Sequence, residues 1–139
     1  VGIGTLLLTG IGDTLRVSLT GDPVQEARVG KSILKSAGLL REGIEIVSCP
    51  TCGRTEIDIP AIAREVREKT AHIRTPLTVA VMGCVVNGPG EAREADVGIA
   101  GGRDSGILFR KGKRVRICRA DELIPALLTE IDSVLKERK

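Results

Sequence analysis

Apolar residues along the chain fall into short continuous runs and into helical spacings, and these two patterns predict its secondary structure. Strands are expected at residues 6–8, 14–19, 44–47, 77–82, 96–100, 106–110 and 114–117. Helices are expected from Pro23 to near Gly38, from Asp58 toward Pro76, and from Asp121 onward. Strands and helices therefore alternate, which is typical of an α/β fold.

Two parts of the chain differ in how completely they can fold. Residues 41–139 hold enough elements for a compact α/β domain, a mixed sheet with helices packed on it. Residues 1–40 hold a strand region and one helix, which cannot close a sheet of their own. We therefore expect two domains, with 1–40 as the end of something longer and 41–139 as the compact domain.

Composition limits the classes of protein to which the chain can belong. Of its 139 residues, 42% are hydrophobic and 28% are charged, which suits a globular protein. No apolar stretch is long enough to cross a bilayer and no signal-peptide pattern opens the chain, so a cytoplasmic protein without membrane contact is expected. Val1 stands where an initiator Met is expected, which indicates a processed chain or an excised fragment.

Basic residues gather late in a chain whose net charge is only +3. They are Arg110, Lys111, Lys113, Arg114, Arg116 and Arg119. Nucleic-acid binding would require aromatic side chains beside these charges, and Phe109 is the single aromatic residue in the sequence. A solvated hairpin is the better interpretation, and no nucleic-acid partner is expected.

Four cysteines in a chain without an export signal favour metal or redox chemistry over a disulfide framework. Cys49 and Cys52 form a C-x-x-C turn directly after one predicted strand, and Cys84 follows another. If those strands are parallel neighbours, both turns leave the same edge of the sheet, where open α/β sheets bind their ligands. The pattern therefore predicts that three thiolates converge.

A fourth ligand has three candidates: Cys118, His72 and a carboxylate, of which Glu91 follows Cys84 in the same loop. Cys118, at a predicted strand end, is typical of a buried inert thiol, and His72 lies late in a polar helix.

The glycines beside Cys84 give a bare backbone that can approach a cluster and donate N–H groups to its sulfides. The glycine pairs at 10–12 and 101–102 match no dinucleotide fingerprint and are interpreted as tight turns.

Three kinds of centre compete for these thiols. Structural zinc usually has two closely spaced ligand pairs, and the second pair is absent from this sequence. Thioredoxin-like dithiol chemistry leaves Cys84 and its loop without a role. An iron–sulfur cluster uses all three thiols, so the sequence favours a cluster over zinc, with dithiol chemistry third.

Two long segments, SCPTCGRT at 48–55 and MGCVVNGPGE at 82–91, closely resemble the 4-hydroxy-3-methylbut-2-enyl diphosphate synthase family of the methylerythritol phosphate route to isoprenoids. DVGIAGG at 96–102 and GIGDTLRVSL at 10–19 resemble the same family, so the resemblance runs over nearly the whole chain.

The resemblance implies a 4Fe-4S cluster, with Cys49, Cys52, Cys84 and Glu91 as ligands when the family's residues are carried over onto this sequence. It implies an iron–sulfur oxidoreductase that reductively opens and dehydroxylates 2-C-methyl-erythritol 2,4-cyclodiphosphate to 4-hydroxy-3-methylbut-2-enyl diphosphate. Ferredoxin or flavodoxin is the implied electron donor. Because iron releases an oxygen ligand more readily than a thiolate, Glu91 is the expected catalytic ligand that gives way to a substrate oxygen.

The family also carries a TIM barrel ahead of its cluster domain, and residues 1–40 resemble the last strand and helix of that barrel. Arg16 and Ser18 fall on the matching strand and, with Asn87, are the implied substrate contacts. Family members are homodimers in which the cluster domain of one subunit caps the barrel of the other.

A TIM barrel takes about 250 residues, so this sequence is too short to hold one. We therefore expect a C-terminal piece of a longer protein or a truncated gene product, able to bind a cluster but without turnover on its own. A non-catalytic iron–sulfur electron-transfer module and a zinc-stabilised interaction module are the alternatives.

Overall fold

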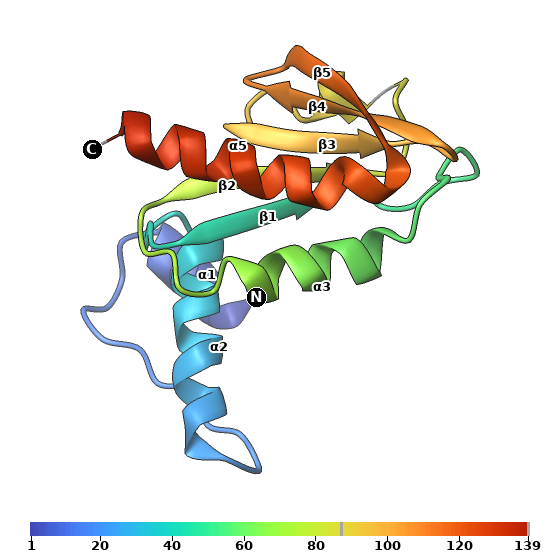
Figure 1. Ribbon diagram of the computed structural model, residues 1–139. Coiled ribbons are helices and arrows are strands. Elements are labelled where there is room, and N and C mark those ends of the chain that lie inside the picture. The colour runs from blue at the N-terminus through green and yellow to red at the C-terminus, as the bar shows by residue number, and fades with distance from the viewer. Residues whose placement is uncertain (87, 139) are drawn as a thin grey trace. The chain divides into compact units, whose positions relative to one another are not determined.

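The computed structural model describes residues 1–86 and 88–138, and Figure 1 shows the chain as a ribbon. The chain divides into two compact units, Val1–Glu42 and Gly43–Lys139. The assignment of these parts to a barrel remnant and a cluster domain stays a prediction.

The second unit is built on one mixed sheet of five strands in the order β1-β2-β3-β4-β5. The first three strands run parallel and the last two pairings are antiparallel. The strands are β1 (Ile44–Ser48), β2 (Leu77–Met82), β3 (Val97–Gly101), β4 (Ser105–Arg110) and β5 (Lys113–Arg119). The predicted α/β fold with a mixed sheet is confirmed, and each strand expected after residue 41 forms within a few residues of its expected bounds.

Two helices cover one face of this sheet, α3 (Ile59–Lys69) and α5 (Leu123–Glu137). Figure 1 shows α5 in front of the strands and α3 alongside β1. A short 3-10 turn, Ala120–Glu122, leads into α5. The apolar stripes of the two helices meet alternate residues of β2, β3 and β4, because successive side chains of a strand point to opposite faces. The core on this side includes Val66, Val79, Ile99, Leu108, Leu127 and Ile131, each at most 1% exposed.

The opposite face carries a smaller core under α4 (Gly88–Glu91) and the turn that follows it. Its buried members are Ala80, Met82, Ala92, Ala95, Ala100 and Phe109. Small side chains dominate here, so the short helix lies close to β3. This close approach places the loop after β2 directly on the sheet.

Ion pairs hold the C-terminal end of α5 to the strands. The Arg110 guanidinium on β4 donates to both carboxylate oxygens of Glu137 and lies 3.6 Å from Glu130. Arg138 donates to the Pro76 carbonyl oxygen at 2.7 Å and to the Asp96 carboxylate. The basic residue Arg110, expected to be solvated, is therefore engaged with acidic side chains.

The helix α3 begins as expected and ends earlier than expected. Asp58 caps it, since its Oδ1 accepts from the Ala61 N–H at 3.0 Å. The prediction that it continues toward Pro76 is wrong, because the helix ends at Lys69. The buried Thr70 hydroxyl donates back to the Val66 carbonyl at 2.7 Å, and the chain turns there, so His72 lies outside the helix.

The first unit contains α1 (Gly2–Leu8) and α2 (Pro23–Ser36), joined by an extended segment. The predicted helix from Pro23 is confirmed, with Asp22 accepting from the Val24 N–H at 2.9 Å. The strands predicted at 6–8 and 14–19 are wrong for this structure: residues 6–8 are helical and 14–19 take no regular structure. A strand needs a neighbour for its N–H and C=O groups, and neither segment pairs with one within the described residues.

The segment 14–19 nevertheless keeps the alternation of a strand. Leu15 and Val17 are half-buried, and both approach Gly30, a buried position on α2. The Leu19 N–H donates to Glu26 Oε1 at 2.9 Å. Arg16 and Ser18, the residues in between, are exposed.

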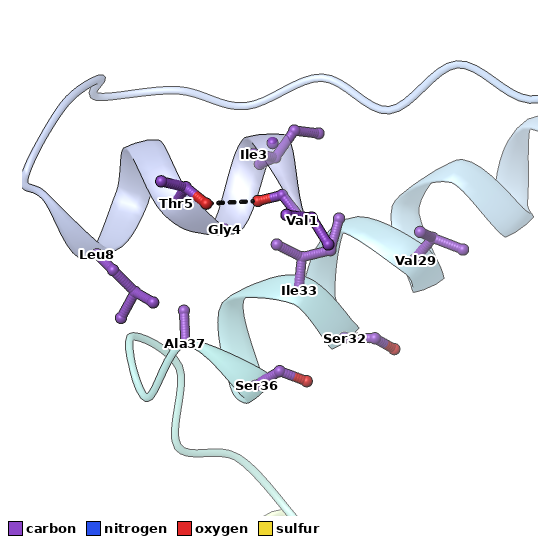
Figure 2. Close-up of a pocket in the computed structure, with 11 residues that line it drawn as sticks. Val1, Ile3, Gly4, Thr5, Leu8, Val29, Ser32, Ile33, Ser36 and Ala37 are labelled. Carbon is purple, nitrogen blue, oxygen red and sulfur yellow. Dashed lines mark hydrogen bonds between the residues drawn. The ribbon is translucent and has the colours of Figure 1, made fainter.

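An open cavity of about 780 Å³ lies in this first unit, between α1 and α2 (Figure 2). Apolar side chains line most of it, among them Leu8, Val29 and Ile33. Figure 2 also shows the Thr5 hydroxyl donating to the Val1 carbonyl, at 3.0 Å. The cavity holds none of the residues predicted to bind metal or substrate.

Candidate metal centre

The loops that carry Cys49 and Cys84 leave neighbouring strands at one edge of the sheet. β1 pairs with β2 in parallel, with Ser48 opposite Val81, so their carboxyl ends lie side by side. The backbone N–H of Gly83 donates to the Sγ of Cys49 at 3.3 Å, which links the first thiol to the residue before Cys84. The predicted parallel pairing is therefore confirmed, and it brings the two loops into contact.

The C-x-x-C turn is closed by the side chain of Thr55. The Cys52 N–H donates to Thr55 Oγ1 at 3.1 Å, and the Thr55 N–H donates to the Cys52 carbonyl at 3.0 Å. The Thr55 hydroxyl thus accepts a hydrogen bond from the turn itself. Cys49 is half-buried and Cys52 is exposed.

Hydrogen bonds from Arg54 lower the pKa of the Cys52 thiol below its ordinary value, first through its backbone N–H and then through its side chain. Both bonds favour the thiolate, which is the form that binds metal. An exposed thiol with donors of this kind is suited to act as a ligand.

Close packing explains two glycines of the loop after β2. A Cβ at Gly83 would lie 2.7 Å from Ile59 Cδ1 and 2.8 Å from Thr55 Cγ2. A Cβ at Gly88 would lie 2.7 Å from Met82 Cβ and 2.9 Å from Ala100 Cβ. These glycines were expected to let the backbone approach a cluster, but protein contacts alone already require them. Gly90, in contrast, faces open space.

A third loop, after β3, joins the other two. The Glu56 N–H donates to the Gly83 carbonyl at 3.1 Å, and Glu56 Oε2 accepts from the Arg103 N–H at 3.1 Å. Sequence reasoning missed this connection and interpreted Gly101–Gly102 as a tight turn. In the structure a Cβ at Gly101 would overlap Ile57, at 2.3 Å from its Cδ1, so this glycine makes room for the cysteine loop. Its position at the end of a third parallel strand is the signal that could have revealed the contact.

Cys118, one of the predicted candidates for the fourth ligand, lies apart from these loops. Cys118 is 4% exposed in the core under α3 and α5, whereas Cys49 packs against the smaller core on the opposite face. This burial agrees with the interpretation of Cys118 as an inert thiol. The side chain of Glu91 and all of Asn87 fall outside the described part of the structure. Arg16 and Ser18 belong to the first unit.

Whether these residues fit an iron–sulfur cluster can be judged from the donor set. All four cysteines are free of disulfides. Among the side chains that the structure describes, no three of Cys, His, Asp and Glu stand close enough to hold one metal ion. A cluster places its cysteines on separate irons and needs them farther apart than a single zinc does. Three free thiols at one sheet edge, one of them accepting a backbone N–H, fit that arrangement.

Comparison with protein families gives two matches. The GcpE protein C-terminal domain matches residues 45–133, a range that includes the three thiols of these loops. The GcpE TIM-barrel domain matches residues 1–31. No helix of the described residues is long and apolar enough to cross a membrane.

Curated relatives are similar along almost the whole chain. The 4-hydroxy-3-methylbut-2-en-1-yl diphosphate synthase (flavodoxin) of Caldanaerobacter subterraneus is 62% identical over 137 residues, which cover 99% of this chain and 39% of the relative. Proteins of the same name from Geobacter sulfurreducens and Aquifex aeolicus are 60% and 56% identical, each over 99% of this chain. The chain spans only 39% and 38% of these two relatives.

Proposed function

The chain belongs to the GcpE family, and from that premise we propose that it is the cluster-binding part of an isoprenoid-pathway oxidoreductase. One observation carries the proposal: the family match spans both cysteine loops, and these loops lie side by side on parallel strands. The names of the relatives, all synthases of the same diphosphate, support the reaction class.

We assign the cluster to four residues of this chain. Cys49, Cys52 and Cys84 would hold three corners of a 4Fe-4S cluster, and Glu91 the fourth. When bound, the cluster supplies electrons one at a time and a Lewis-acidic iron for a substrate oxygen. The Gly83 N–H, already on the Cys49 sulfur, stabilises negative charge there and raises the tendency of the site to accept an electron.

The substrate would be 2-C-methyl-erythritol 2,4-cyclodiphosphate. Two electrons and two protons convert it to 4-hydroxy-3-methylbut-2-enyl diphosphate and one water, with cleavage of one C–O bond to the diphosphate and loss of one hydroxyl. Flavodoxin, which appears in the names of the relatives, or ferredoxin would deliver the electrons. Arg16 would bind the diphosphate through charge-assisted hydrogen bonds, with Ser18 and Asn87 as further contacts.

Turnover requires more than the present sequence. The relatives are more than twice as long, and the first 31 residues match a barrel family only as a short fragment. In our proposal the active unit is a homodimer of the long form, in which a barrel completes the substrate site. The 139-residue chain alone would bind a cluster and leave the cyclic diphosphate unchanged.

Anaerobic reconstitution of this chain with ferrous iron and sulfide tests the proposal. We expect a broad visible absorption band with about four irons and four sulfides per chain. Glu91→Ala should weaken cluster retention, while Cys118→Ala should leave the iron content unchanged because that thiol is in the core. A Cys84→Ala variant should lose the cluster.

Other results would redirect the assignment. A colourless protein, or one that takes up a single zinc, would exclude the cluster and favour a structural metal module. A cluster that survives Glu91→Ala and is lost on Cys118→Ala would indicate an all-cysteine electron carrier.

A further inference from the structure

Glu56 contacts both loops that flank its own. Its backbone N–H donates to the carbonyl of Gly83, next to Cys84, and its Oε2 accepts from the Arg103 N–H on the loop after β3. The following residue, Ile57, packs its side chain against Gly101, the last residue of β3 before that third loop. One dipeptide therefore ties the cysteine loop to two neighbours.

The side-chain bond is separable from the rest of this linkage. The bond from Glu56 to Gly83 uses the backbone and survives any substitution other than proline. The bond to Arg103 is made by the carboxylate alone, and a charged acceptor makes a stronger hydrogen bond than a neutral one. A Cβ added at Gly102 would lie 3.2 Å from Glu56 Oε2. The backbone of the third loop therefore packs closely against this carboxylate.

From this geometry we propose that Glu56 is a positioning residue for the cluster. Its carboxylate fixes the Cys49–Cys52 loop to the Gly102–Arg103 turn and thereby sets the separation between that loop and Cys84. The proposal rests on the proposed cluster function of the three thiols. The third loop carries no thiol, and its role in the site is to hold the first loop in place.

A surface glutamate without this role would behave differently. Exposed surface residues away from long-range contacts usually tolerate substitution with little effect on stability. Glu68 is exposed on the helix α3 and provides the matched control. The Glu56 carboxylate, in contrast, accepts a hydrogen bond from a backbone group 47 residues away. Removing that carboxylate should therefore displace the Cys49–Cys52 loop relative to Cys84.

The test compares Glu56→Ala, Glu56→Gln and Glu68→Ala in the 139-residue chain after anaerobic reconstitution. The first measurement is the rate at which an iron chelator removes the cluster, followed by visible absorption. We expect Glu56→Ala to lose its cluster roughly fivefold faster than wild type, the scale of one lost hydrogen bond. Glu56→Gln should stay within about twofold of wild type, because its amide oxygen can accept the Arg103 N–H.

A second measurement needs no cluster. In the metal-free chain a short bifunctional thiol reagent should bridge Cys84 to a thiol of the Cys49–Cys52 loop, detected by mass spectrometry after digestion. The yield should fall in Glu56→Ala and persist in Glu56→Gln and Glu68→Ala. Urea unfolding of each variant shows whether a lower yield comes from loop displacement or from loss of the fold.

The two proposals fail in different ways. Wild-type chain that takes up no cluster would overturn the proposed function, while the bridging yields would still decide the role of Glu56. If the wild-type chain binds a normal cluster, the positioning role alone would be overturned by one result. That result is a Glu56→Ala variant that matches Glu68→Ala both in its rate of cluster loss and in its bridging yield. A Glu56→Ala variant that unfolds at the wild-type urea concentration yet loses its cluster faster would support it.

Discussion

The backbone N–H of Gly83 donates a hydrogen bond to the Sγ of Cys49 at 3.3 Å. The donor belongs to the loop that carries Cys84, and the acceptor is the sulfur of Cys49. This hydrogen bond therefore holds the two cysteine loops together before any metal is bound. Backbone donors to sulfur are a common way in which proteins adjust the potential of iron–sulfur sites. The bond depends on a residue without a side chain at position 83, where a Cβ would meet Thr55 and Ile59.

Gly83→Ala should therefore disturb both stability and metal uptake. The added methyl group forces Ile59 and Thr55 to shift, at a cost of about 1–3 kcal/mol. It also separates the Gly83 N–H from Cys49, so the iron content after reconstitution should fall. Urea unfolding and iron analysis measure the two effects. Gly90→Ala, in the same loop but facing open space, is the control and should match wild type in stability.

The exposure of the cysteines predicts an order of alkylation in the metal-free chain. Cys52 is exposed and its pKa is lowered by Arg54, so it should react first with iodoacetamide at neutral pH. Cys49 and Cys84 are half-buried and should follow. Cys118, 4% exposed in the core, should react only on unfolding. Mass spectrometry of a time course checks the order, and early labelling of Cys118 would contradict the packing described for β5.

The second unit was predictable from sequence because its elements carry strong local signals. β2, Leu77–Met82, is a continuous apolar run buried on both faces, and its predicted bounds match the structure. The helix α5 shows a clear apolar stripe, and Asp58 marks the start of α3. In the first unit the same reasoning failed at residues 6–8, because a β-rich pattern forms a strand only where a partner strand exists.

The candidate site was predictable only in part. The C-x-x-C turn and Cys84 follow strands whose parallel pairing could be inferred, and that placed two loops at one edge. The role of Glu56 could not be inferred, because its partner Arg103 lies 47 residues away on a loop with no metal ligand. The close fit of Gly88 against Met82 and Ala100 likewise depends on tertiary packing that no local pattern encodes.

Asp58 links the cysteine loop to the helix α3, and its removal should weaken the second unit. Its Oδ1 accepts from the Ala61 N–H at 3.0 Å, so Asp58→Ala leaves that donor without its cap and should cost about 1 kcal/mol. Asp58→Asn keeps an acceptor and should restore most of the loss. Urea denaturation followed by circular dichroism measures both variants. Equal losses in the two would show that the negative charge, rather than the hydrogen bond, stabilises the helix.

The pairing of Arg110 with Glu137 predicts how stability changes in acid. Hydrogen bonding from the Arg110 guanidinium lowers the pKa of Glu137 below its ordinary value of 4.5 in the folded chain. A lowered folded pKa contributes stability above the unfolded pKa, and that contribution disappears as pH falls through the folded value. Wild type should therefore lose stability below about pH 4.5 more steeply than Glu137→Gln, which cannot ionise.

Both side chains of the pair are partly solvent-exposed, at 29% and 55%, so the difference in stability between wild type and Glu137→Gln will be small and reduced by salt. Thermal melting from about pH 6 down to about pH 3 measures it, with Glu68→Gln on α3 as the control. Parallel pH profiles for wild type and Glu137→Gln would mean that this ion pair does not stabilise the docking of α5 on β4.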